Sequence, residues 1–435
     1  MKSALIFLIT ILFLMNTIIS AQSPKEFAEI WDKQHISNIM PSNVRHKDLQ
    51  NYLEKLKSLG LKVEEVGRSY ADREIYQIEW GTGKLKVFMW SQMHGDEPTA
   101  TSTLMDMLSF LQNNRKNLKW VETLEKSITL RIVPMLNPDG AELFQRRNLQ
   151  SIDINRDARE LNTPEGRLLK KLRDEWQPDI GFNLHNQNPL TTVGDTPNQA
   201  AISLLAVSGN LEGKTSEGHE RNKRLCTLMI NALNQFIKGH IGRYDDEYNP
   251  RAFGDRISEW GTPVILVETG ALHGKDEMFL VKLNFIAYLT ALQALVDGSE
   301  KNADPKIYEN TPFNGEGLFS AIFRNANIIN PTQSLEPFVS DIAANAERRR
   351  GNEESPMFVR EVGDLSVFKG LETFDVKDYY LVAKSNLVRI GTPVHFFFYH
   401  KDKAKNIDWK AADLETKFPP DAIYKDGKWL KSLRK

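Results

Sequence analysis

Residues 84–98 read KLKVFMWSQMHGDEP, and they contain the three features that decide the fold. The first half is an apolar, β-rich run, the middle is a polar turn, and Pro98 suits the first turn of a helix. A continuous apolar run of this kind predicts a central strand that is buried on both faces. A strand that passes through a short turn into a helix is typical of a layered α/β domain.

The same alternation of short apolar runs and helical periodicity continues from residue 25 to about residue 298. It predicts strands at residues 75–80, 85–90, 128–134, 180–184 and 264–267, and helices at residues 44–59, 98–112, 164–176, 221–238 and 277–297. We therefore expect one α/β domain over residues 25–298. The polar, proline-bearing segment 299–314 is expected to be a linker, and the strand-like runs after it predict a smaller, mainly β accessory domain at residues 315–435.

Two histidines and a glutamate stand where predicted strands end. His94 and Glu97 follow the first quoted strand, and His185 follows the run 180–184. In an open sheet the carboxyl ends of the strands form the edge where ligand sites collect. Imidazole and carboxylate both bind zinc at about 2.0–2.2 Å, and two His with one Glu leave a fourth position open, as in catalytic zinc sites. The alternative is that these are ordinary polar side chains at a helix start and a strand end.

Glu268 comes directly after the apolar residues 263–267. A carboxylate in this position is costly to bury unless it has a partner or a chemical task. Beside a metal ion it would take a proton from the activated water and deliver it to the leaving amine. The alternative is a carboxylate that pairs with a neighbouring arginine and stabilises the fold.

A polar segment lies between these residues in the sequence. It begins with the turn Asn-Pro-Asp-Gly at residues 137–140 and continues as RRNLQSIDINRD at residues 146–157. Because a guanidinium grips a carboxylate through two parallel hydrogen bonds, this arginine-rich segment suits an anion site. Taken alone, it could equally be a solvated loop.

Composition and charge exclude some classes of function. The chain has 435 residues, of which 41% are hydrophobic and 26% are charged, so it can bury a full core. A net charge of -1 gives no electrostatic reason to expect nucleic acid or an anionic membrane as a partner. The run Arg348-Arg349-Arg350 is interpreted as a solvated helix end.

The first residues are typical of a secretory signal. Met-Lys is followed by an apolar run over residues 4–19 and then by the small residues Ser20 and Ala21. We expect cleavage after Ala21, export to the periplasm or the extracellular medium, and no stable membrane insertion. A membrane anchor is the alternative, but the run is shorter than the roughly 20 residues that span a bilayer. The single cysteine, Cys226, is predicted to be a core residue of a helix.

Taken in chain order, these residues resemble the zinc carboxypeptidase family over roughly residues 93–270. The matching elements are His-x-x-Glu, Asn-Pro-Asp-Gly, an Arg seven residues before Asp-x-Asn-Arg, a strand-end His and a strand-end Glu. The resemblance implies an α/β/α sandwich around a mixed, mainly parallel sheet. It also implies one zinc ion and a peptide or peptide-like substrate.

The resemblance implies a role for each matched residue. The implied zinc ligands are His94, Glu97 and His185, and the implied general base is Glu268. Arg146 is the implied cation that polarises the scissile carbonyl and its oxyanion.

Substrate-binding residues follow from the same resemblance. Asn155 and Arg156 are the implied clamp on the terminal carboxylate of the substrate. A mobile tyrosine from the loop before the last catalytic strand closes over the substrate in this family, and we favour Tyr248 over Tyr244. The Asp157 that follows the Asn-Arg pair and the absence of disulfides are departures from the pancreatic digestive enzymes, and the chain looks more like bacterial members.

The function expected from these residues is a metallocarboxypeptidase that hydrolyses the C-terminal peptide bond through a zinc-activated water. An alternative is a zinc-dependent amidase or deacylase that acts on cell-wall peptides or acylated amino acids. A non-catalytic binding protein with the same fold is a further alternative. By the same resemblance, Arg251 and Arg256 lie near where the family's pocket floor is built, which implies an acidic terminal residue in the substrate, unless they pair with Asp245, Asp246 or Asp255.

Overall fold

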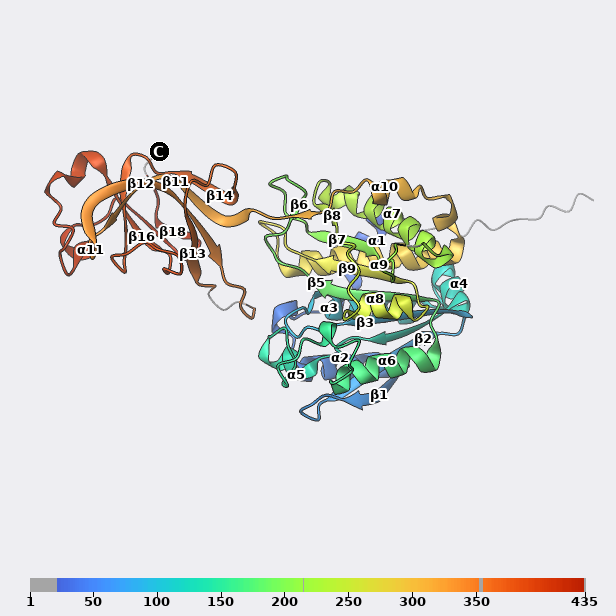
Figure 1. Cartoon of the computed structure of the whole chain (residues 1–435). Helices are drawn as coiled ribbons and strands as arrows, with labels where there is room; N and C mark the ends of the chain where they lie inside the picture. The colour runs from blue at the N-terminus through green and yellow to red at the C-terminus, as the bar shows by residue number, and fades with distance from the viewer. Residues whose placement is uncertain (1–21, 214, 352–354, 434–435) are drawn as a thin grey trace, which may run out of the picture.

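The computed structural model describes residues 22–213, 215–351 and 355–433, and these form two parts joined by an extended segment (Figure 1). The larger part, here called the α/β domain, contains the elements from α1 to α10. The smaller part, the β domain, contains the strands from β11 to β18. The predicted signal at residues 1–21 lies outside the described residues.

The α/β domain is built on an eight-stranded sheet with the order β1-β2-β4-β3-β5-β9-β7-β8. Its four central strands β4, β3, β5 and β9 are mutually parallel, and antiparallel pairs flank them. The expected mixed, mainly parallel sheet is thus confirmed. The strands are β1 (Lys62–Arg68), β2 (Glu74–Gly81), β3 (Leu85–Ser91), β4 (Ile128–Val133), β5 (Ile180–Asn186), β7 (Ile202–Ala206), β8 (Ile241–Arg243) and β9 (Val264–Thr269).

All five predicted strands of this sheet are present, with two informative differences at their ends. β5 and β9 each continue past their apolar run, so that His185 and Glu268 are strand residues and not loop residues. Backbone pairing along the sheet edge therefore fixes both side chains. β1, β7 and β8 were not predicted.

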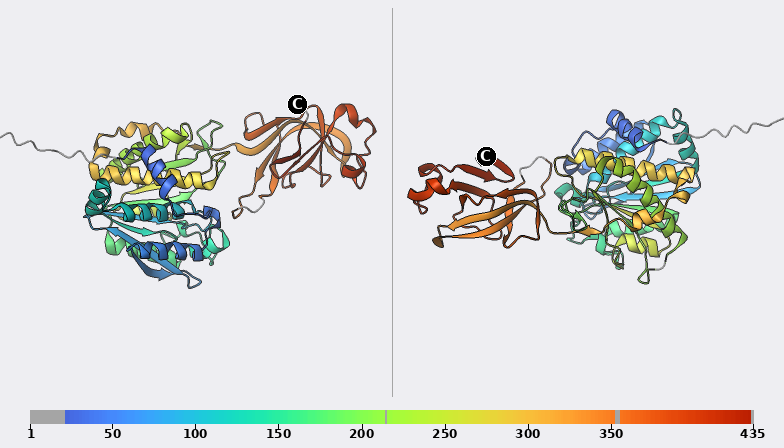
Figure 2. Two further views of the ribbon diagram at one scale, coloured as in Figure 1. Left: turned by 180° about the vertical axis from the view of Figure 1, so that it is seen from behind. Right: turned by 90° about the horizontal axis from the view of Figure 1, so that it is seen from above.

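Helices cover both faces of this sheet (Figures 1 and 2). One face carries the larger apolar core, to which α1, α2, α3, α4, α7, α9 and α10 contribute. α6 and α8 pack on the other face over a second core. The helices are α1 (Pro24–Gln34), α2 (His46–Ser58), α3 (Thr99–Asn114), α4 (Lys119–Ser127), α5 (Pro138–Leu143), α6 (Pro164–Trp176), α7 (Glu217–Ile237), α8 (Phe253–Glu259), α9 (Glu277–Asp297) and α10 (Pro305–Glu309), with 3-10 turns at Pro41–Asn43 and Ile154–Arg156.

The longest apolar helix of the described residues, α9, belongs to this core. Asp276 caps its start by accepting a hydrogen bond from the backbone N–H of Phe279, and Gly298 ends it with φ of 75°. By length and composition alone it could cross a membrane, but 67% of its most apolar window is buried inside the protein. It packs against α3 and α7, and Cys226 lies fully buried on α7. These contacts are those of a core helix.

The segment 299–314 is not the linker that we expected. It forms a 3-10 turn (Ser299–Asn302) and α10, and α10 packs on α7. Tyr308 is buried, and its hydroxyl accepts a hydrogen bond from the backbone N–H of Ala206 at 3.0 Å. β10 (Asn314–Gly315) then pairs with β6 (Thr192–Val193). The prediction was wrong because a few buried residues anchor an otherwise polar segment.

The β domain is a mainly antiparallel sheet around an aromatic core, which confirms the expected β-rich C-terminal region. Phe323, Phe396, Phe398 and Tyr424 are fully buried in it. The strands are β11 (Leu318–Asn330), β12 (Ser334–Ala346), β13 (Met357–Gly363), β14 (Lys369–Asp375), β15 (Tyr379–Ala383), β16 (His395–His400), β17 (Ala422–Lys425) and β18 (Lys428–Lys431), with a 3-10 turn at Lys401–Asn406 and α11 at Leu414–Lys417.

Candidate metal centre

The turn after β3 aims His94 and Glu97 at the carboxyl edge of the sheet. Gln92 adopts a left-handed backbone with φ of 50°, and its side-chain amide donates to the Gly95 carbonyl at 2.9 Å. A Cβ on Gly95 would lie 1.9 Å from the carbonyl carbon of Gly140. Only glycine permits this approach between the turn and α5.

His94, Glu97 and His185 converge at this edge. The Nδ1 atom of His94 lies 2.8 Å from Glu97 Oε1, and the Nδ1 atom of His185 lies 2.6 Å from Glu97 Oε2. The two Nδ1 atoms are 3.2 Å apart. All three side chains are buried, and they form a group of ligand atoms that could hold a metal ion.

The chemistry of this donor set fits zinc. Two ligands at about 2.0–2.1 Å from a tetrahedral zinc ion stand about 3.3 Å apart, which agrees with the 3.2 Å between the two Nδ1 atoms. The site also favours positive charge. Burial lowers the pKa of His94, but the charge of Glu97 and the hydrogen bond to Asp153 outweigh it and raise this pKa to about 9.

Asp153 holds the outer nitrogen of His94, a contact that we did not predict. Its Oδ1 atom lies 3.0 Å from His94 Nε2 and its Oδ2 atom accepts from Arg146 Nε at 3.0 Å. Metal-binding histidines usually present their second nitrogen to a carboxylate, which fixes the orientation and tautomer of the ring. The sequence signal was available, since Asp153 opens the Asp-x-Asn-Arg motif.

Glu268 lies beside His185, because the two residues are direct partners in the parallel pairing of β5 and β9. Its side chain is buried, and its Oε2 atom has no hydrogen-bond partner among the residues that the structure describes. Burial and the charge of Glu97 raise the pKa of Glu268 well above its usual range. A carboxylate so placed is poised to exchange protons with a ligand, and no arginine pairs with it in the described part of the chain.

Arg146 lies against the same cluster. Its Nη1 atom donates to Glu97 Oε1 at 3.2 Å, and Asp153 accepts from its Nε atom. About two-fifths of the side chain is exposed, so the guanidinium borders both the buried carboxylates and the open cavity.

The side chains of the Asn-Pro-Asp-Gly turn are held by structural hydrogen bonds, one of which joins Asn137 to the Arg146 carbonyl at 3.5 Å. Asn137 caps α5 by accepting a hydrogen bond from the Gly140 N–H at 2.8 Å, and its amide donates to the Met93 carbonyl at 3.2 Å. Asp139 is fully buried and accepts from Ser69, Ala71 and Arg73. These bonds tie the start of the arginine segment to the turn that carries His94.

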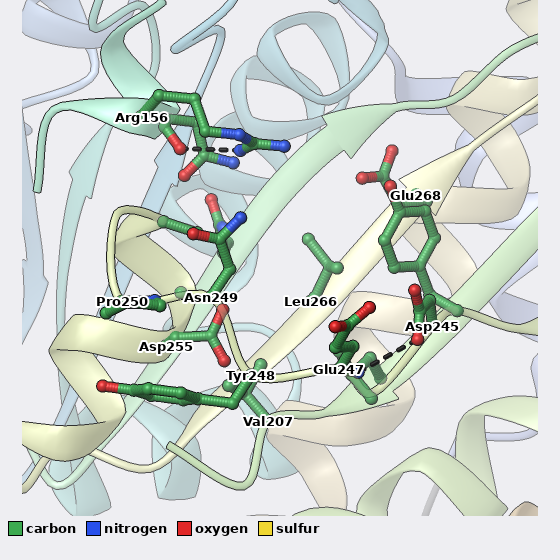
Figure 3. Close-up of a pocket in the computed structure, with 16 residues that line it drawn as sticks. Arg156, Val207, Asp245, Glu247, Tyr248, Asn249, Pro250, Asp255, Leu266 and Glu268 are labelled. Carbon is green, nitrogen blue, oxygen red and sulfur yellow. Dashed lines mark hydrogen bonds between the residues drawn. The ribbon is translucent and has the colours of Figure 1, made fainter. Parts of the chain in front are cut away.

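Two cavities meet at Glu268. The first, here called the metal cavity, has a volume of about 380 Å³ and is lined by His94, Glu97, Arg146 and Glu268, among others. The second, the side pocket, has a volume of about 420 Å³ and extends between β9 and the loop 244–255 (Figure 3). Both are lined by Asn155, Arg156, Tyr244 and Glu268.

Asn155 and Arg156 stand at the junction of these cavities. Asn155 Oδ1 accepts from the Phe253 N–H at the start of α8, so its amide nitrogen is the donor that a ligand could use. Arg156 is exposed and its Nη1 atom donates to the Asn155 carbonyl at 2.7 Å (Figure 3). The structure thus places both residues within the space that Glu268 borders.

The two candidate tyrosines differ in what they face. Tyr248 lines the side pocket, but its hydroxyl donates to Glu259 at 2.8 Å, and its ring lies across the pocket from Glu268 (Figure 3). Tyr244 lines both cavities, and the charge of Glu268 together with burial raises its pKa to about 12. The structure brings Tyr244, and not Tyr248, close to Glu268.

The arginines that indicated an acidic terminal residue do not line either cavity. Arg256 pairs with Glu259, and Arg251 is exposed on the loop surface. Asp255 lines the side pocket instead, where burial raises its pKa to about 7. The two arginines therefore have no place in the lining of either cavity, whereas Asp255 of α8 lines the side pocket.

Comparisons with known proteins agree with this geometry. The sequence profile described as "Zinc carboxypeptidase" matches residues 48–212. "Probable carboxypeptidase 2" of Arthroderma benhamiae is 30% identical over 130 residues, which are 29% of this chain and 24% of that protein. "Carboxypeptidase E" of Caenorhabditis elegans is 29% identical over 119 residues, 23% of this chain and 25% of that protein. The chain thus spans about a quarter of the length of these relatives.

The solved structures that match the chain are less similar to it in sequence than these relatives are. A metallo-carboxypeptidase from Burkholderia cenocepacia has a TM-score of 0.49 and 17% identity, and the match covers 58% of this chain and 69% of that one. A metallo-carboxypeptidase from Pseudomonas aeruginosa, solved in complex with (2-guanidinoethylmercapto)succinic acid, has a TM-score of 0.47 and 19% identity, with 58% and 68% coverage.

Proposed function

We propose that the chain is a zinc metallocarboxypeptidase that removes the C-terminal residue of a peptide, and the match of residues 48–212 to the zinc carboxypeptidase family supports the proposal. The observation that carries the proposal is the position of Glu268. This buried carboxylate is the direct strand partner of the metal-ligand candidate His185 and borders the cavity that Asn155 and Arg156 enter. The candidate general base, the candidate metal ligands and the residues that could bind the terminal carboxylate therefore border adjoining cavities.

His94, Glu97 and His185 would hold the zinc ion, and Asp153 would keep the His94 ring in place. Zinc in such a site lowers the pKa of water and polarises a carbonyl oxygen. All other steps fall to the side chains of this protein.

Those side chains are placed for the work of peptide hydrolysis. Glu268 would take a proton from the attacking water and transfer it to the nitrogen of the leaving amino acid. Arg146 would stabilise the negative charge that develops on the carbonyl oxygen, because its guanidinium already borders the cavity. Asn155 and Arg156 would hold the free carboxylate of the terminal residue, and this contact restricts cleavage to the last bond.

Paired substrates test this exo-acting mechanism. We expect the zinc-loaded protein to hydrolyse a peptide with a free C-terminus at least about 100-fold faster than its amidated twin, since the amide cannot form the charged clamp. An Arg156→Ala variant should lose most of this difference. Equal rates on both peptides, or hydrolysis of muropeptides alone, would favour the amidase or deacylase instead.

The side pocket supports a basic terminal residue. Leu205, Val207 and Leu266 form apolar walls that suit the methylene stem of lysine or arginine. Asp255 lies in the pocket, and the Oδ1 atom of buried Asn183 has no hydrogen-bond partner within the described ranges. These two oxygens could accept from an ammonium or guanidinium group.

An isosteric pair of substrates tests the preference. We expect a peptide ending in lysine to be cleaved about 10- to 100-fold more efficiently than one ending in norleucine, which lacks the ammonium group. Asp255→Asn should remove most of this ratio. Glu247→Gln is the matched control, because Glu247 is exposed at the rim and should change the ratio less than about threefold. An unchanged ratio in Asp255→Asn would exclude Asp255 as the selecting group.

The same proposal includes export. It rests on the residue pattern of 1–21 alone, with a lysine, an apolar run and small residues in signal-like order. Mass spectrometry of the protein from its native source should find a chain that begins at Gln22. A chain that retains residues 1–21 in the membrane fraction would indicate an anchor.

A further inference from the structure

The β domain contributes Arg348 to the lining of the metal cavity. Arg348, in the connection between β12 and β13, lines the metal cavity together with Asp96, Arg146 and Glu268. Residues more than 200 positions apart in the sequence thus share one cavity. The interpretation of residues 348–350 as a solvated helix end was wrong, because this run is a loop between two strands that contacts the α/β domain.

Hydrogen bonds and cation–π contacts hold this loop against the α/β domain. The Nη2 atom of Arg350 donates to the carbonyls of Ala141 and Glu142, at 2.6 and 2.9 Å, at the end of α5. Arg348 and Arg350 each place a guanidinium 5.3 Å from the centre of the Phe144 ring. Helix α5 leads into the segment that carries Arg146, so the loop docks beside the catalytic residues.

Gly351 shows that the docking is close. Its φ of 54° lies in the left-handed region, and a Cβ at this position would lie 1.8 Å from Asn43 Oδ1. Its backbone N–H donates to Ser42 Oγ at 3.0 Å. The loop therefore fits the α/β domain with no room for a side chain at residue 351.

The position of Arg348 relative to the two cavities decides which part of a substrate it meets. The side pocket receives the terminal residue and is not lined by Arg348. The metal cavity lies on the other side of Glu268 and includes Arg348 and the residues 186–189. A peptide whose last side chain fills the side pocket and whose scissile bond lies at the candidate metal ligands would extend into the metal cavity, where its residues before the scissile bond lie near Arg348.

The charge around Arg348 is available to a ligand. Arg348 makes no ion pair with any residue that the structure describes. Asp96 lines the same cavity, and burial and the charge of Glu97 raise its pKa, while Arg348 acts to lower it. Of the two other cations that line the cavity, Arg146 is already paired with Glu97 and Asp153, and Arg156 is assigned to the terminal carboxylate of the substrate.

We propose that Arg348 of the β domain binds a carboxylate of the substrate on the amino side of the scissile bond, so that the enzyme selects peptides with an acidic residue there. This inference rests on the proposed carboxypeptidase function. An exposed guanidinium above a ring keeps its donors free for bidentate binding of a carboxylate. The accessory domain is then a part of the substrate site and not only an appendage.

Two matched peptides test the proposal. They differ only in Glu or Gln at one of the two positions before the terminal residue, and their affinity for the zinc-loaded Glu268→Gln protein is measured by calorimetry at low salt. We expect the Glu peptide to bind about three- to tenfold more tightly than the Gln peptide. For the active enzyme the same ratio should appear in KM more than in kcat, because the contact is made before and during reaction alike.

Variants of the same loop separate charge from docking. In Arg348→Ala the Glu-to-Gln ratio should fall to about one, and in Arg348→Glu a Lys peptide should replace the Glu peptide as the tighter ligand. Arg349→Ala is the matched control, because Arg349 is exposed and lines neither cavity. The ratio of Glu-peptide to Gln-peptide affinity in Arg349→Ala should equal that of the parent protein.

The outcomes are distinguishable from failure of the proposed function. Hydrolysis with a Glu-to-Gln ratio near one, or a ratio that Arg348→Ala leaves unchanged, would overturn the role of Arg348 and leave the carboxypeptidase intact. Absence of hydrolysis of every peptide would overturn the proposed function, while the binding ratio would still report on Arg348. A ratio that Arg349→Ala abolishes equally would mean that loop charge in general, and not Arg348, attracts the ligand.

Discussion

The group of candidate metal ligands and the side pocket lie next to each other. Strand ends carry most of the first, whereas irregular segments line most of the second. His185 and Glu268 are neighbouring residues of two buried parallel strands, and His94 follows a third. The side pocket is lined largely by the loop 244–252 and the first turn of α8, and Asp245 and Glu247 of this loop are exposed. The strand edge holds the candidate metal ligands and Glu268 in fixed positions, whereas the side pocket is lined by the kind of segment that commonly carries binding residues.

The largest effect is expected from a substitution at the strand edge. Glu268→Gln keeps the size of the side chain but cannot accept a proton, so kcat should fall about 10²- to 10⁴-fold. Metal analysis should still find one zinc ion per chain, because Glu268 is not among the grouped ligand atoms. Loss of zinc together with activity would make Glu268 a ligand and not a base.

A smaller effect is expected at the outer layer of the cluster. Asp153→Asn removes the charge that faces His94 Nε2, and the affinity for zinc should fall about 10- to 100-fold in competition with a chelator. If affinity were unchanged while activity fell, Asp153 would act through Arg146, its other partner.

The side pocket predicts that the preference between two substrates depends on pH. The Asp255 carboxyl has its pKa raised to about 7 by burial, with Asp245 raising it further and Arg156 lowering it. The group is therefore neutral below about pH 7 and charged above it, while a substrate lysine stays protonated to about pH 10. The lysine-to-norleucine ratio of kcat/KM should rise between about pH 6 and pH 8.

A ratio of two substrates cancels the ionisations that both share, including those of Glu268 and of the metal site. Asp255→Asn should give a ratio that does not change with pH. A ratio that rises equally in this variant would assign the titration to a different group.

The smallest effect sharpens the choice between the tyrosines. Tyr244→Phe should lower kcat/KM about three- to tenfold, because it removes a hydroxyl that lines both cavities and faces Glu268. Tyr248→Phe should change kcat/KM less than about twofold, since its hydroxyl bonds Glu259. The reverse order would restore the role that the sequence suggested for Tyr248.

Most buried strands of the α/β domain could be predicted, although β7, which is equally apolar and buried, was missed. β3, β5 and β9 are continuous apolar runs, and such runs are visible without any tertiary information. β1 was missed because it is an edge strand whose residues are largely exposed, and β8 has only three residues. α1 was missed although its capping box of Ser23 and Glu26 is visible in the sequence, because only Phe27, Ala28 and Trp31 are buried.

The residues of the candidate site also fall into those that the sequence predicts and those that it does not. His94, Glu97, His185 and Glu268 were placed from strand ends, and the structure brings them together because parallel strands end at one edge. The roles of Tyr244 and Asp255 depend on how α8 and the preceding loop turn, which no local pattern encodes. Arg348 could not be predicted at all, since it reaches the cavity only through the docking of a separate domain.

The burial of Cys226 has a practical consequence for following that docking. It is the one sulfhydryl of the chain, it is fully buried on α7, and burial raises its pKa, so it presents no thiolate to reagents in solution. A cysteine introduced at Arg349 would therefore be the only position that a maleimide dye labels in the folded protein. Movement of the β domain could then be recorded in the otherwise native chain without first removing a background thiol.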